Sequence, residues 1–156
     1  MVRVQAEKLV RYTRWANDLV FSHIQSMTKY PERVALVIAH IVRAEEVWLS
    51  RLREVSAGPE PIWPEWDFNT SNSRRLAVEQ GLLAFVCECS ENNFDTEITY
   101  TTSRGDEFKT LVIDIFNQLI IHGGYHRGQV MELLRSAGAP TTNTDFITFT
   151  RAAPGR

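Results

Sequence analysis

Cysteine is scarce in this sequence, and its two cysteines are poorly placed for the sites that cysteines usually build. Cys87 and Cys89 are separated by one residue, which is too close for an easy disulfide and does not match the two-residue gap of zinc knuckles or thioredoxin-like sites. A disulfide framework and a cysteine-based zinc or redox site are therefore not expected. We expect two free thiols packed along a helix in a reducing compartment.

Long apolar runs and a strong charge of one sign are also missing. No apolar stretch approaches the ~18 residues of a membrane span, and the charged start of the chain lacks the apolar core of a secretory signal. The 17 basic and 19 acidic residues are interspersed, which gives a formal charge of -2 and leaves no basic patch for nucleic acid. We therefore expect a cytoplasmic protein with neither a membrane nor a nucleic acid as partner.

Apolar residues make up 44% of the 156 residues, which is enough for one buried core, and they recur mostly with the helical period. This period predicts helices over about Val4–Met27, Glu32–Val55 and Leu111–Ala137, and a further one that begins among Asn69–Ser73 and ends near Asn93. The expected fold is all-α: a four-helix bundle that forms one domain over residues 1–150, followed by a frayed tail over 151–156.

The connections carry their own signals. Residues 56–69 hold three prolines and three aromatic side chains, so we expect this segment to pack over the bundle as a cover. Glu97–Thr102 and Glu107–Thr110 flank the turn Ser103–Asp106 and predict a β-hairpin between the third and fourth helices, which must lean on the bundle to be stable. The apolar stretch 144–149 is expected to dock on the core.

Histidine is rare too, but its placement is informative. His122 and His126 stand four residues apart in the fourth predicted helix, on the face that also carries Leu119 and Val130, so both imidazoles are expected to point into the bundle. His40 lies in the inward apolar stripe of the second predicted helix. Three imidazoles from two facing helices can hold one divalent metal ion and leave a coordination position open. Ordinary packing of core histidines is the competing interpretation.

Two classes of metal enzyme are excluded by what the histidine motif lacks. The residue after His122 is Gly123, whereas zincin proteases need glutamate there as general base. Di-iron carboxylate bundles need glutamate three residues before histidine, and the residues at those positions are Val37, Leu119 and Gly123. Gly123 and Gly124 disfavour a helix, so bulk is unwanted there, either beside the ligands or against a neighbouring helix. His23 has no partner in the pattern and is expected to be structural.

Several segments resemble the motifs of a known family. His40–Arg51 resembles the first histidine motif of the DinB family of damage-inducible four-helix proteins, and His122–Gln129, which reads H-x-x-Y-H-R-G-Q, resembles its second. Arg14–Asn17 and Thr144–Ile147 resemble its first helix and its C-terminal tail. Ile121 departs from the asparagine of many members. The resemblance implies an up-down-down-up bundle, commonly dimeric, in which the three histidines hold one divalent metal.

The resemblance also suggests a class of reaction. The best understood relatives transfer bacillithiol or mycothiol to electrophiles, and a distant branch isomerises maleylpyruvate. We therefore predict a metal-dependent thiol S-transferase that takes a small thiol and an electrophile. The alternatives are a non-catalytic stress or interaction protein, in which His23, Glu45 or Asp145 closes the metal site, and a metal-dependent hydrolase. Zinc or nickel is the expected ion, and three imidazoles also accept iron, manganese or cobalt.

Polar side chains near the predicted centre are candidates for the chemistry. Tyr125, Asn17 and Asp145 are the candidates for a catalytic role, and Glu45, Arg127 and Gln129 are the candidates for orienting the histidines. For Glu45 and Arg127 we favour ordinary surface charge pairing instead. A homodimer that uses the surface around the first and fourth helices is also expected.

Overall fold

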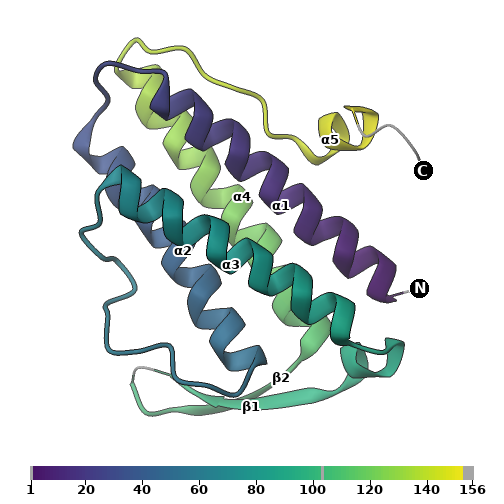
Figure 1. Ribbon diagram of the computed structural model, residues 1–156. Coiled ribbons are helices and arrows are strands. Elements are labelled where there is room, and N and C mark those ends of the chain that lie inside the picture. Colours follow the sequence, from purple (N-terminus) through teal and green to yellow (C-terminus); the bar gives the residue numbers. More distant parts are fainter. Residues whose placement is uncertain (1, 103, 153–156) are drawn as a thin grey trace.

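Four long helices form a bundle in the computed structural model, which describes residues 2–102 and 104–152 (Figure 1). α1 (Val2–Gln25), α2 (Glu32–Leu52), α3 (Phe68–Glu88) and α4 (Val112–Ser136) run up, down, down and up. α2 packs against both α3 and α4, and α1 packs against the same two helices. The predicted all-α bundle and its up-down-down-up order are therefore confirmed.

The helices meet along apolar stripes with the helical period, so that burial of these stripes drives their association. Fully buried residues on the inner faces include Val20 and Ile24 of α1, Val34, Ile38 and Ile41 of α2, Val86 of α3, and Ile115, Phe116 and Leu134 of α4. No helix within the described residues combines the length and the apolar character that a bilayer span requires.

α2 ends at Leu52, three residues earlier than predicted. Glu54 adopts the left-handed conformation, with φ of 56°, and the backbone N–H groups of Glu54 and Val55 donate to the carbonyls of Arg51 and Ser50. This pattern is a Schellman cap, which is usually built on glycine. The sequence pointed to Gly58 as the stop signal because a glutamate at the left-handed position carries no recognisable signal.

α3 is shorter and starts earlier than predicted. Asp67 is its N-cap, and the Asp67 carboxylate accepts a hydrogen bond of 2.7 Å from the backbone N–H of Thr70. The helix ends at Glu88 because Cys89 is extended, and a new capping box at Ser90 starts the short 3-10 helix η1 (Glu91–Asp95). The predicted end near Asn93 is therefore wrong, because two separate helices, α3 and η1, follow one another within one apolar pattern.

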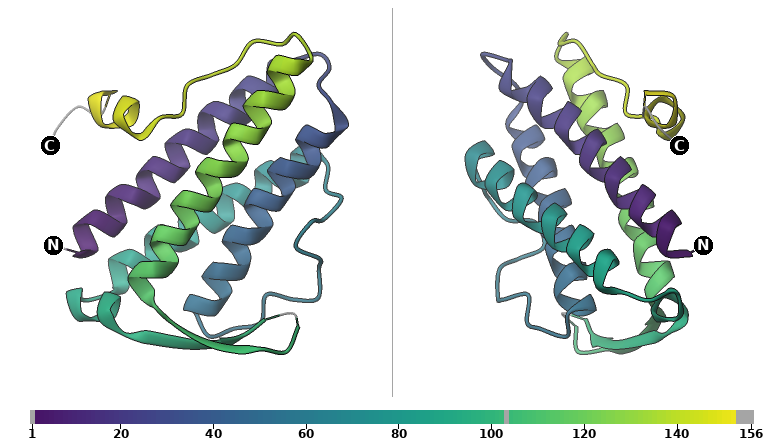
Figure 2. Two further views of the ribbon diagram at one scale, coloured as in Figure 1. Left: turned by 180° about the vertical axis from the view of Figure 1, so that it is seen from behind. Right: turned by 45° about the vertical axis from the view of Figure 1, so that its right-hand side comes forward.

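The connection over residues 53–67 makes the parallel course of α2 and α3 possible (Figure 2). α2 has 21 residues, so it is roughly 30 Å long and the chain must return by that distance before α3 begins. Fifteen extended residues can cover about 50 Å, so the segment is longer than the direct path requires and can fold over α2. Within it, the Ile62 carbonyl and the Trp63 ring contact His40 on α2, as expected for a cover.

The predicted hairpin is present as β1 (Glu97–Thr101) and β2 (Glu107–Leu111), which pair in antiparallel register. β2 leads directly into α4, so the hairpin closes the lower end of the bundle (Figure 1). The Tyr100 ring packs edge-on against Trp48 of α2, with 5.3 Å between ring centroids. The hairpin therefore leans on α2. Ser103 in the predicted turn lies outside the described residues.

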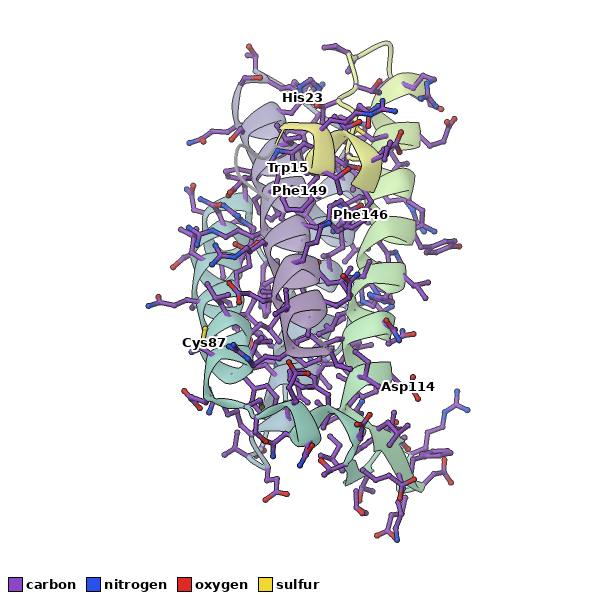
Figure 3. All side chains as sticks on the ribbon, turned by 90° about the vertical axis from the view of Figure 1, so that its right-hand side faces the viewer. Trp15, His23, Cys87, Asp114, Phe146 and Phe149 are labelled. Atoms are coloured by element: carbon purple, nitrogen blue, oxygen red, sulfur yellow. The ribbon has the colours of Figure 1, made fainter. Side chains whose placement is uncertain are left out.

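The C-terminal stretch docks on α1 as the short helix α5 (Phe146–Ala152), which lies outside the bundle (Figure 2). Figure 3 shows Phe146 and Phe149 of α5 lying against α1 near Trp15. The Phe146 ring lies edge-on to Tyr12, with 5.1 Å between centroids, and Phe149 lies 5.6 Å from Trp15. α5 continues through residues 151 and 152, which corrects the predicted start of the frayed tail. Residues 153–156 lie outside the described part of the chain.

Candidate metal centre

Three of the four histidines come together where α2 faces α4. His122 and His126 lie one turn apart on α4, and His40 projects from α2 toward them. One ring nitrogen of each lies within 4.8 Å of the others, and Nε2 of His40 is 3.2 Å from Nε2 of His122. Two nitrogen ligands of a tetrahedral zinc-like ion are about 3.3 Å apart, so this separation fits one shared ion.

Hydrogen bonds at the far side of two rings orient their lone pairs inward. Nδ1 of His40 donates to the backbone carbonyl of Ile62 at 2.7 Å. Nδ1 of His126 lies 2.8 Å from the side-chain carbonyl of Gln129 and donates to it. A neutral imidazole that donates through Nδ1 keeps a free lone pair on Nε2. Both rings therefore present a ligand atom to the centre of the group.

The surroundings favour the neutral form of two imidazoles of the group, those of His122 and His40. Burial lowers the pKa of His122 to about 4, and the neighbouring His126 and His40 add to that shift. Burial also lowers the pKa of His40, against the opposing hydrogen bond to Ile62. Neutral imidazole is the form that binds a metal ion, so the group is ready to ligate at neutral pH. The three histidines lie close enough to hold one ion, and their donor set fits it.

The connection between α2 and α3 supplies a lid for the group. The indole of Trp63 stacks on the His40 ring, with 3.7 Å between centroids and an angle of 4° between the planes. The same indole meets the His126 ring edge-on at 5.7 Å. Trp63 and the Ile62 carbonyl were not singled out from the sequence because loop residues have no period that would reveal their contacts. The density of prolines and aromatic side chains was the only signal.

A large cavity opens beside the histidines. It measures about 1200 Å³ and lies between α2, the connection that follows α2, and the hairpin. His40 and His122 form part of its wall at one end, and Trp48, Arg51 and Tyr100 line it farther along. An ion held by the histidines would therefore face a space large enough for a small-molecule ligand.

The other candidate ligands stand apart from this group. His23 donates from Nε2 to the backbone carbonyl of Pro140 at 2.7 Å, which is the structural role expected for it. Cys87 and Cys89 are both free and do not join the histidines. Among the described residues no carboxylate joins them either. The group therefore consists of three ligands from the protein.

Comparison with known proteins identifies the relatives of this chain. The sequence model of the DinB family matches residues 1–156. The chain belongs to the DinB family. It is also similar to Protein DinB of Bacillus subtilis (strain 168), with 23% identity over 159 residues that cover 90% of this chain and 91% of that protein. Family membership and the three-histidine group together fit a metal-binding DinB-like protein.

The structure brings some of the other predicted residues of this DinB-family protein to the centre. Gln129 accepts the hydrogen bond from His126, and Tyr125 meets the His126 ring edge-on, with 5.0 Å between centroids. Tyr125 is 65% exposed and does not line the cavity beside the histidines. Asp145 is exposed at the start of α5, where its carbonyl accepts from Thr148 and Phe149, and the described contacts do not link it to the histidines.

The surface charge pairing favoured for Glu45 and Arg127 is wrong. Glu45 is 1% exposed and Arg127 is 0% exposed. Each follows a histidine by five residues, which turns it about 140° around the helix, away from the histidines and toward α1 and α3. There both residues contact Asn17. Arg127 donates a hydrogen bond of 3.0 Å to the side-chain carbonyl of Asn17, and the side-chain amide of Asn17 donates one of 3.3 Å to Glu45. The structure thus places all three residues in a separate buried cluster.

Two residues of α3 complete this cluster and were missed by sequence reasoning. Glu79 accepts from Asn17 at 3.0 Å and pairs with Arg75, which also reaches Asp18 at 2.6 Å. Burial raises the pKa of Glu45 to about 8, and the neighbouring carboxylate of Glu79 contributes next. When Glu45 is neutral, the guanidinium groups of Arg75 and Arg127 face the carboxylates of Glu79 and Asp18. The charges of the cluster then cancel without ionisation of Glu45. Arg75 and Glu79 are charged and lie in α3, whose apolar pattern is weak, so the sequence gave no sign that they are buried.

Gly123 packs against Arg127 and not against a ligand or a neighbouring helix. A methyl group at Gly123 would lie 2.9 Å from a terminal nitrogen of Arg127, whereas one at Gly124 would lie 4.0 Å from the same guanidinium. We expect Gly123→Ala to destabilise the fold by about 1–2 kcal/mol because the buried guanidinium must shift away from Asn17.

Gly124→Ala is the matched control for this prediction. It gains helix propensity without a clash, so we expect it to be neutral or to stabilise by up to about 1 kcal/mol. Urea unfolding of both variants measures the difference. Equal stabilisation by the two alanines would show that Arg127 yields freely and would contradict the expected strain.

Proposed function

We propose that this protein binds one divalent metal ion through His40, His122 and His126 and transfers a low-molecular-weight thiol to a small electrophile. The observation that carries the proposal is the three-imidazole group at the end of an open cavity of about 1200 Å³. With three protein ligands, the expected ion keeps a position for a ligand from the cavity. A bound ion would supply the Lewis acidity that lowers the pKa of a thiol.

The protein's own residues would position and shield the reactants. The Ile62 carbonyl and Gln129 hold two imidazoles in the tautomer that ligates, and Trp63 covers the group on one side. The thiol proton would leave to solvent through the open cavity. The sulfur would then form a bond to the electrophilic carbon, whose leaving group departs with the electrons of the broken bond. Tyr125, whose ring meets that of His126, is proposed to orient a reactant.

Cobalt-substituted protein tests this function directly. We expect glutathione to shift the visible spectrum of the cobalt form, and we expect conjugation of glutathione to monochlorobimane, with loss of chloride, at least tenfold above the uncatalysed rate. Both signals should disappear in His40→Ala and persist in His23→Ala. A cobalt spectrum that is indifferent to thiols, together with no conjugation, would instead favour the non-catalytic metal-stabilised protein.

We also propose that the protein forms a homodimer. Ile121 and Tyr125 are 70% and 65% exposed on α4, and exposed apolar side chains on one helix support the predicted homodimer. The proposed partners are accordingly a small thiol, a small electrophile and a second copy of this chain. Nucleic acid is not among them, since the charge is balanced.

A further inference from the structure

One face of α2 runs from the histidine group along the whole cavity. His40, Ala44, Val47, Trp48 and Arg51 all line the cavity, and their spacings of three and four residues place them on one face of the helix. Arg51 follows His40 by eleven residues, which is three turns, or roughly 16 Å along the helix axis. The cavity therefore has a histidine end and an arginine end.

Arg51 is held by aromatic rings at its end of the cavity. Its guanidinium carbon lies 4.4 Å from the centroid of the Trp48 ring and 4.3 Å from that of the Tyr100 ring, and these two rings stand at 77° to one another. Within the described part of the chain, the guanidinium of Arg51 makes no hydrogen bond and no ion pair, and its contacts with Trp48 and Tyr100 are to ring faces. The rings orient the guanidinium while its N–H groups stay unpaired.

Three other arginines on or beside α2 are occupied. Arg43 donates to the carbonyls of Ala57, Gly58 and Glu60 and pairs with Glu46. Arg53 pairs with Glu88, and Arg74 pairs with Glu46 and Glu60. Arg51 differs from these three, because its guanidinium contacts the faces of two aromatic rings and no hydrogen-bond acceptor of the described residues. An unpaired, oriented guanidinium in a cavity wall is suited to an anion from outside.

We propose that Arg51 binds the anionic group, a carboxylate or a phosphate, of the ligand whose thiol reaches the histidine end. This inference rests on the proposed function and specifies the class of substrate. The side chain of Arg51 leans toward the helix N-terminus, so the two ends are separated by less than the axial 16 Å, about 10–16 Å. The ligand is therefore an elongated acidic thiol of roughly tripeptide size, and short neutral thiols do not reach both ends.

Three acidic residues, Glu54, Glu60 and Glu97, also line the cavity, and Glu60 pairs with Arg74. Glu54 and Glu97 do not pair with Arg51 in the structure, but each is a competitor for it in solution. If one of them occupied Arg51, a ligand carboxylate would gain nothing from the guanidinium. The test therefore has to compare charged and neutral ligands on the unaltered protein as well as on variants.

The first measurement uses the cobalt-substituted protein with glutathione and with its glycine ethyl ester, in which one carboxylate is removed. We expect the unaltered protein to bind glutathione at least tenfold more tightly than the ester. Arg51→Gln should erase this difference, and Arg53→Gln, a neighbouring arginine whose side chain faces Glu88, should preserve it. Equal affinities for both ligands on the unaltered protein would overturn the proposal, and this comparison does not depend on how well a variant folds.

The second measurement separates this proposal from the proposed function. S-methylglutathione has no free thiol, so its binding to the metal-free protein, followed by tryptophan fluorescence, reports the anion site alone. We expect Arg51→Gln to weaken it at least fivefold. If S-methylglutathione binding depends on Arg51 but thiols do not change the cobalt spectrum, S-transfer is rejected and the anion site is kept. If the unaltered protein and Arg51→Gln bind S-methylglutathione equally well, the anion site is rejected. Competition by inorganic phosphate and by succinate shows which anion Arg51 prefers.

Discussion

His126→Ala is expected to abolish stoichiometric metal binding, with an affinity at least about a hundredfold weaker than that of the unaltered protein. The imidazole of His126 supplies one of three ligand nitrogens, and its Nε2 is prepared for ligation by the hydrogen bond to Gln129. Loss of a partner that only orients a ligand already weakens metal sites by about 10–100-fold, so loss of the ligand itself should exceed this. Elemental analysis after purification, followed by competition with a chelator, measures the effect.

His23→Ala is the control for metal binding, since His23 bonds to Pro140 and takes no part in the group. It should keep the full metal content. His40→Ala should behave like His126→Ala although it lies on a different helix. If both variants retained the metal at full occupancy, the three-histidine site would be ruled out, and the histidines would be ordinary core residues.

The free energy of unfolding should fall as the pH rises from about 6.5 to 8, and Glu45→Gln should remove most of this fall. The raised pKa of Glu45, about 8, means that the folded protein keeps a proton that the unfolded chain releases near pH 4.5. Stability from this group is complete below pH 4.5 and is lost as the pH approaches 8, with a slope of up to about 1.4 kcal/mol per pH unit. Burial raises the pKa of Glu79 as well, which acts in the same direction.

The pH window is chosen to exclude the histidines. The lowered pKa values of His122 and His40 have the opposite sign, so they raise stability with pH only below about 6.5. Metal-free protein unfolded with urea at several pH values between 6.5 and 8 gives the slope. Glu132→Gln, at an exposed ion pair with Arg135, should leave that slope unchanged. An equal slope in Glu45→Gln would place the titration elsewhere.

The histidine group was the most predictable part of the site. A spacing of four residues on an amphipathic helix dictates that two imidazoles share a face, and the apolar stripe of α2 dictates that His40 points inward. Both inferences need only local geometry. The bundle order came from the family resemblance, and the approximate helix ranges came from the apolar period.

The cover and the buried cluster could not be predicted in the same way. Trp63 contacts His40 through a loop, and loop conformation is set by many weak contacts that leave no period in the sequence. Glu45 and Arg127 are charged, and charged residues are exposed unless partners are buried with them. Those partners, Asn17 on α1 and Glu79 on α3, are distant in sequence, so only the assembled bundle reveals the compensation.

His40 and His122 are 82 residues apart in the chain, yet their ring nitrogens are 3.2 Å apart in the fold. An ion held between them would act as a crosslink that closes more than half of the polypeptide into a ring. By the loop-entropy relation used for disulfides, closing a ring of this size disfavours the unfolded chain by on the order of 4–5 kcal/mol. Chelation would then lower the free energy of unfolding of the whole bundle, because it would remove the crosslink between α2 and α4 and restore the lost freedom of the unfolded chain.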